Sequence, residues 1–196
     1  MLKLDNVKMA LEKAAKEIIR QAKINLSATQ NIMQNDGKMR RKRIDASGNL
    51  SRSLKYSDIT NEDGNLSIDI LMDFYGPFID QGVDGTRNKT PNKTPFSFKN
   101  EGVGVGMQYS IFEWMRAKRF RIRDLNTGRF KKGKVTSKSY ENLAYVIARS
   151  IKRKGINQTY FITTPFNLTT SQLPVILEKA LSADIEAYLL SLNKVK

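Results

Sequence analysis

The sequence contains no cysteine and no histidine. Without cysteine, disulfide bonds and thiolate metal ligands are excluded. Without histidine, the chain lacks the commonest general base and metal ligand, and it lacks every Ser-His-Asp or Cys-His arrangement. Most hydrolase classes are therefore disfavoured, and carboxylate–metal chemistry is the main catalytic option that remains.

Long apolar runs are missing as well. No stretch approaches the roughly 20 apolar residues that span a bilayer, and the opening MLKLDNVKMALEKAAKEI lacks the continuous apolar centre of a signal peptide. We therefore expect no membrane segment. Hydrophobic residues make up 40% of the chain, enough for the core of a single domain over 1–196. The net charge of +15 favours a polyanionic partner, which could be nucleic acid, an acidic membrane surface or an acidic protein.

Apolar periodicity predicts the secondary structure. Recurrence at three and four residues indicates helices over 4–26, 107–117, 139–154 and 172–193, with Ser139 as a cap, Gly155 as a stop and Pro174 in a first turn. Alternation on both sides of the turn signal NEDG predicts a β-hairpin over about 52–75, whose buried face includes Phe74. INQTYFIT reads as a further strand, whereas 27–49 shows no periodicity. The predicted fold is α+β, a small antiparallel β-sheet packed by the N-terminal, mid-chain and C-terminal helices.

Two patterns could carry chemistry, and neither is specific. GVGVG at 102–106 lacks the spacing of a dinucleotide or phosphate loop, so we interpret it as a hinge. Asp69, Asp73, Asp80 and Asp84 could collect a divalent cation, but acids of turns and strand faces are far commoner. We therefore expect no metal, no cofactor and no enzymatic activity, with a carboxylate–metal nuclease as the least favoured alternative.

A basic segment at 116–134 is predicted to form a protruding hairpin around the turn NTG. It interleaves Phe120 and Phe130 with many cations. Aromatic rings among cations can stack on nucleic-acid bases, or they can anchor the hairpin while its charges stay solvated. Contact with a protein partner and contact with DNA are equally compatible with this pattern. The candidate contact residues are Arg119, Arg121, Arg123, Arg129, Lys131 and Lys132.

Three features occur in an order that resembles a known family. ASGNLSRSL at 46–54 precedes the hairpin, YGPFIDQGVDGT at 75–86 follows it, and ARSIKRKGI is followed by TYFIT at 159–163. This series resembles the tail-completion, or neck, proteins of tailed double-stranded-DNA bacteriophages over about 46–165. The matching positions are Gly48, Leu50, Ser53, Tyr75, Gly76, Phe78, Ile79, Asp80 and Gly82. The basic hairpin and the long C-terminal helix exceed the family's compact pattern.

The resemblance implies a structural role. Such proteins form homo-oligomeric rings, hexamers or dodecamers, that join portal or adaptor proteins to tail proteins, and genomic DNA passes through the lumen. The expected location is the neck of the virion, after assembly in the host cytoplasm. The runner-up function is a basic DNA-binding protein that uses the 116–134 arm.

Within this interpretation, YGPFIDQGVDGT forms a turn and a subunit or partner interface. Glycine permits sharp turns, and we expect a positive φ at Gly85. Asp80 would accept backbone N–H groups in the turn or meet a cation of the next subunit. The candidate interface residues are Tyr75, Gly76, Phe78, Asp80, Gly82, Asp84 and Gly85.

Overall fold

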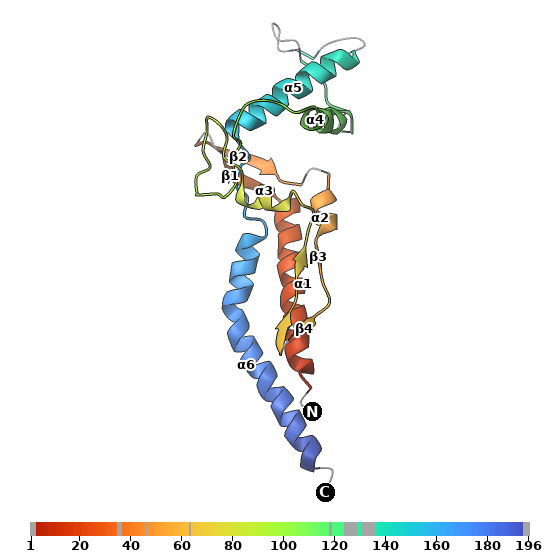
Figure 1. The fold of residues 1–196 in the computed structure, drawn as a ribbon, viewed down its shortest axis with the longest axis vertical. Helices are drawn as coiled ribbons and strands as arrows, with labels where there is room; N and C mark the ends of the chain where they lie inside the picture. The colour runs from red at the N-terminus through yellow and green to blue at the C-terminus, as the bar shows by residue number, and fades with distance from the viewer. Residues whose placement is uncertain are drawn as a thin grey trace. The chain divides into compact units, whose positions relative to one another are not determined.

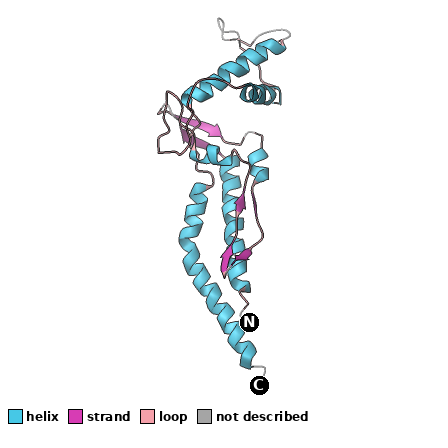
Figure 2. Ribbon diagram, viewed as in Figure 1, coloured by secondary structure: helices cyan, strands magenta, loops and turns pink. Residues whose placement is uncertain are grey.

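The computed structural model describes residues 3–34, 37–45, 47–62, 64–117, 119–123, 129–130 and 136–193. Over these residues the chain has an α+β fold (Figures 1 and 2). Its helices are α1 Asp5–Ser27, α2 Asn49–Ser53, α3 Gly76–Gln81, α4 Val105–Ala117, α5 Ser137–Lys154 and α6 Thr163–Asn193. Its strands are β1 Thr29–Met33, β2 Met39–Arg43, β3 Lys55–Tyr56, β4 Thr60–Glu62, β5 Asn65–Ser67 and β6 Ile70–Leu71.

The chain divides into two compact units. The first unit comprises Met1–Ile32, Arg40–Asp80 and Thr159–Lys196, and the second comprises Met33–Met39 and Gln81–Gln158. Each unit is thus built from segments that are distant in the sequence. The division does not test the prediction of a single domain, which stays a prediction.

The core of the first unit is built on α1, which lies beside α6 (Figure 1). The helix predicted over 4–26 is confirmed, and its buried residues Ala15, Ile18, Ala22 and Leu26 recur at helical spacing. The rest of the buried cluster comes from Leu50 of α2, from Leu54 directly after that helix, and from Phe161 and Ile162 directly before α6. Burial of such side chains stabilises the unit by about 1.5–3 kcal/mol each.

The predicted hairpin is confirmed in its centre and wrong at its ends. β3 pairs antiparallel with β6, and β4 pairs antiparallel with β5 across Gly64, whose φ of 84° suits the turn. The segment before Leu54 is the helix α2 instead of a strand. Phe74 is 86% exposed instead of buried, because the strand pattern ends at β6 and the chain turns into α3.

The second unit pairs α4 with α5. Met115 of α4 and Ala144 and Ala148 of α5 are buried, so small residues let the two helices approach closely. α5 starts earlier than predicted, because the side chain of Thr136, not Ser139, is the N-cap and accepts from the Ser139 N–H at 3.3 Å. Gly155 ends α5 with φ 81°, as predicted.

Two further expectations are wrong. Residues 27–49, predicted to be irregular, contain the paired strands β1 and β2. INQTYFIT forms no strand beyond the single bridge of Ile156 with Val83. Its last residues lead directly into α6, which begins at Thr163 instead of 172 and therefore contains Pro174 in its interior.

Candidate subunit interface and basic surface

The stretch YGPFIDQ folds as the short helix α3, not as an open turn. Tyr75 and Ile79 pack against the core of the first unit. Gly76 packs closely against the side chain of Met72, which would have to shift to admit a Cβ at this position. Tyr75 and Gly76 therefore serve the packing of their own unit.

Asp80 caps the N-terminus of α6. Its side chain is only 2% exposed, and its carboxylate accepts from the N–H groups of Ile162 at 2.9 Å and Thr163 at 3.2 Å and from the Thr163 hydroxyl. The first N–H groups of a helix lack partners within the helix and carry partial positive charge, so a buried carboxylate suits this place. The chain itself thus satisfies the oxygens of Asp80.

The two glycines after α3 meet different constraints. Gly82 has φ 73°, which a residue with a Cβ rarely adopts. Gly85, in contrast, has no positive φ, so that expectation is wrong. It is glycine because a Cβ there would collide with the carbonyl oxygen of Arg153.

The loop after Gly85 wraps the C-terminal end of α5. The N–H of Thr86 donates to the Lys152 carbonyl at 3.0 Å, and the N–H of Arg87 donates to the Arg153 carbonyl at 3.0 Å. The last carbonyls of a helix need such donors. Asp84 accepts from the N–H and hydroxyl of Thr90, both at 2.8 Å. Burial tends to raise the pKa of Asp84, but the hydrogen bonds from Thr90 and the nearby Lys89 lower it below its usual value.

The described part of the basic arm contains the predicted pairing. Arg123 and Phe130 form an antiparallel bridge, and the guanidinium groups of Arg121 and Arg123 lie 4.4 and 4.5 Å from the centroid of the Phe130 ring. The Tyr140 hydroxyl donates to the Phe120 carbonyl at 2.9 Å and so ties the arm to α5. Arg119 and Arg129 are also exposed, whereas Lys131 and Lys132 lie outside the described residues.

Charge is distributed very unevenly between the units. The second unit carries 19 Lys and Arg against 6 Asp and Glu, a net charge of +13, and the first carries 15 against 13, a net charge of +2. The sequence showed the total charge, but only the division into units shows that one of them holds nearly all of it.

Helix α6 exposes many of its large apolar side chains. The apolar residues from Val175 to Leu189 are only partly covered: Leu177 and Tyr188 are half-buried, but Leu181 and Ile185 are exposed. Asp184 contacts the start of α1, with the N–H groups of Asn6 and Val7 donating to its carboxylate at 3.0 Å each. Residues 185–193 then continue for about 13 Å of helix, past the start of α1 (Figure 1). The apolar residues there remain half exposed: Leu189 54%, Leu190 56% and Leu192 50%.

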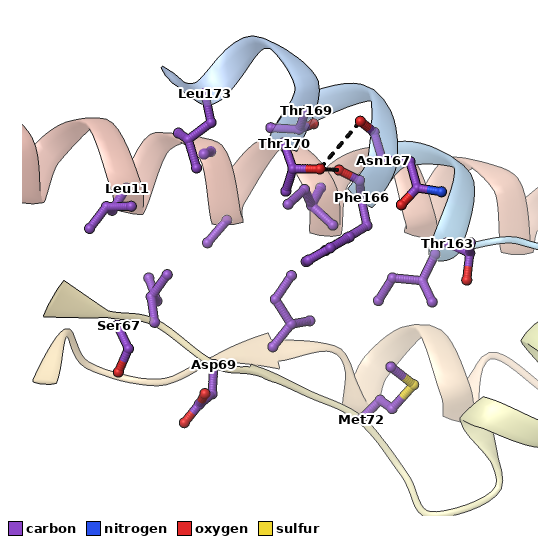
Figure 3. A pocket seen from close by; sticks show the side chains of 16 residues that line it. Leu11, Ser67, Asp69, Met72, Thr163, Phe166, Asn167, Thr169, Thr170 and Leu173 are labelled. Atoms are coloured by element: carbon purple, nitrogen blue, oxygen red, sulfur yellow. Dashed lines mark hydrogen bonds between the residues drawn. The ribbon is translucent and has the colours of Figure 1, made fainter. Parts of the chain in front are cut away.

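A second apolar feature of the first unit is a groove of about 660 Å³ between α1, the first half of α6 and the segment 67–72 (Figure 3). Phe166 points into it from α6, and Leu11 lines it from α1. The exposed surface of the lining is mostly apolar, and its polar side chains come both from the strand side, as Ser67 and Asp69, and from α6, as Thr163 and Asn167. The helical periodicity of α1 gave no sign of this groove, because its walls come from three distant segments.

Comparison with known proteins finds no family model, no curated protein and no solved structure that matches this chain. Within the described residues, no group of three or more Asp and Glu side chains is placed to hold a metal ion. None of the described helices is long and apolar enough to cross a membrane.

Proposed function

We propose that this chain is a structural virion protein, a ring-forming neck or head-to-tail connector subunit of a tailed bacteriophage that joins portal-side and tail-side components. The observation that carries the proposal is the apolar surface of α6, which its own chain leaves uncovered. α6 exposes many large apolar side chains, among them Leu181, Leu189 and Leu190, and exposed apolar surface of this extent favours contact with another chain. Among the described elements α1 is the main neighbour of α6, and much of the apolar surface of α6 stays exposed and is open to contact with another chain.

The charge of the chain favours a second copy as that partner. Two copies with a net charge of +15 each repel one another, so they meet most easily where positive charge is lowest. Of the 34 Lys and Arg residues only Lys179 lies on α6, beside Glu178 and Glu186. A large apolar and weakly charged surface on a strongly basic protein therefore suits self-association.

The two apolar features of the first unit favour a ring. The end of α6 carries exposed apolar side chains and the groove beside Phe166 offers an apolar lining, so the end of one copy can dock into the groove of the next. Contacts between unlike surfaces repeat from subunit to subunit, and they close into a ring when the rotation permits. The resemblance of Tyr75–Gly82 to neck proteins supports the same role, and the proposal assigns no catalytic reaction to the chain.

The test is the native mass of the purified chain, measured by native mass spectrometry alone and with the portal and tail proteins of the same genome. We expect closed rings, and we expect the double substitution Leu189→Gln, Leu190→Gln to leave a folded monomer. Glu186→Gln, an exposed change on the same helix, is the matched control and should leave the mass of the ring unchanged. A wild-type chain that stays monomeric in every mixture would refute the proposal.

The second candidate function is DNA binding, which the net charge of +13 on the second unit favours. It differs from the first in its response to salt, because each phosphate that is neutralised on duplex DNA adds about 0.9 to the log–log slope of affinity against salt. Robust cleavage of DNA in the presence of Mg²⁺ or Mn²⁺ would contradict both functions and favour a carboxylate–metal nuclease.

A further inference from the structure

Three guanidinium groups of the second unit share one carboxylate. Glu101 lies 2.9 Å from Arg87 Nε, 3.3 Å from Arg149 Nη2 and 3.5 Å from Arg153 Nε. These four residues are called the Glu101 cluster. Three positive charges face one negative charge, so the cluster retains two positive charges that no carboxylate within it balances.

The cluster is held in place by the main chain. Arg149 and Arg153 project from the last turns of α5, whose C-terminal end favours cations. Arg87 belongs to the loop whose N–H groups donate to the last carbonyls of that helix, including that of Arg153 at 3.0 Å. Lys152 adds a further cation beside the cluster and donates to the Gly102 carbonyl. The guanidinium groups are therefore brought together before any ligand arrives.

The cluster is also accessible. The side chains of Arg87, Arg149 and Arg153 are 59%, 49% and 36% exposed, and that of Glu101 is 26% exposed. Arg87 first, and then the other two arginines, lower the pKa of Glu101 below its usual value because they stabilise its charged form, whereas burial opposes this shift. A carboxylate in this position resembles an internal substitute for an external anion.

We propose that the Glu101 cluster binds a backbone phosphate of duplex DNA, and that Glu101 competes with that phosphate for the same guanidinium groups. Guanidinium forks match the geometry of phosphate oxygens and bind them in bidentate fashion. The inference does not depend on the proposed ring, because it uses residues of the other unit.

A linear polyanion explains a second feature of the same helix. The described part of the basic arm, with Arg121 and Arg123, is tied to α5 at Tyr140, in the first turn. Arg153 is in the last turn, about 20 Å away along the helix axis. One unit thus has two groups of guanidinium side chains at opposite ends of a helix. A duplex, which presents one charge per ~1.7 Å of its axis, can reach both at once.

The experiment measures the affinity of the full chain for a fluorescent duplex of mixed sequence over a series of salt concentrations. Arg149→Gln should lower the log–log salt slope by about 0.9, the value of one phosphate contact. Glu101→Gln should act in the opposite direction and tighten binding roughly three- to tenfold at low salt, because it removes a competing negative charge. A misfolded variant cannot produce that gain in affinity.

Arg20→Gln is the matched control, since it removes an exposed arginine of the first unit that is also paired with a glutamate, Glu17. It should leave the slope unchanged. Equal slopes for Arg149→Gln and Arg20→Gln, or a Glu101→Gln variant that binds no tighter than wild type, would overturn the proposal. So would equally tight binding of poly-glutamate, which would point to an acidic protein. The native mass of the same variants is measured as well. A failure of the DNA proposal changes the DNA affinities and slopes, whereas a failure of the ring proposal shows in the native mass.

Discussion

Replacement of Asp80 tests the account of how the first unit is held together. Asp80→Ala removes a buried carboxylate and leaves the N–H groups of Ile162 and Thr163 without their acceptor. A buried donor that loses its partner costs about 1–3 kcal/mol, and loss of a helix N-cap typically costs about 1 kcal/mol. The Thr163 hydroxyl can rotate towards another acceptor, so its loss adds little. We therefore expect Asp80→Ala to lower the free energy of unfolding by about 2–4 kcal/mol. That is a large part of the roughly 5–15 kcal/mol by which domains are stable.

Asp80→Asn separates charge from hydrogen bonding at the same site. The amide keeps the volume and one acceptor oxygen but loses the negative charge that opposes the positive end of the α6 dipole. We expect Asp80→Asn to lower the free energy of unfolding less than Asp80→Ala does, by about 1–2 kcal/mol.

The assay is equilibrium denaturation in urea, followed by far-ultraviolet circular dichroism. Asp58→Asn is the control, because Asp58 is exposed in the same unit, and it should stay within about 0.5 kcal/mol of wild type. If Asp80→Ala lowered the free energy of unfolding by less than about 0.5 kcal/mol, the capping role assigned to Asp80 would be refuted. A folded Asp80→Asn variant that fails to assemble would instead support the interface role that the sequence predicted for this residue.

Three more predictions use other contacts. Gly85→Ala should destabilise the second unit by about 2–3 kcal/mol in the same assay, since the new Cβ meets the Arg153 carbonyl; Gly104→Ala, with no atom within 4 Å of the added Cβ, should not. Thr136→Ala should cost about 1 kcal/mol as the loss of an N-cap, and Ser139→Ala clearly less, a difference readable in thermal melts. Burial tends to raise the pKa of Asp184, but the N–H groups of Asn6 and Val7 lower it overall. Its stabilising contribution is therefore present above the unfolded pKa of about 3.9 and lost as pH falls through the lower folded value. Asp184→Asn should flatten this acid dependence in melts between neutral and acid pH, and an unchanged pH profile would contradict the assignment.

The positions of α1, α4 and α5 could be predicted from the sequence because their apolar residues recur at helical spacing. The hairpin around NEDG could be predicted because a turn signal lies between alternating segments. In contrast, β1 and β2 escaped prediction, since KMRRKR carries no alternating pattern and only pairing with the facing strand makes it a strand. The start of α6 was missed as well, although Thr163 and Pro165 are residues that often begin a helix.

The sequence by itself determined the absence of cysteine and histidine, the excess of positive charge and the helices whose apolar residues recur at helical spacing, because these depend on composition and local spacing. The tertiary structure decided what the individual residues do. Asp80 became a helix cap because α6 begins beside it, and Gly85 is glycine because the last turn of α5 leaves no room. Glu101 became the centre of three arginines that lie 14 to 52 residues away in the sequence. Such roles depend on which segments meet in space, and no local pattern in the sequence encodes that.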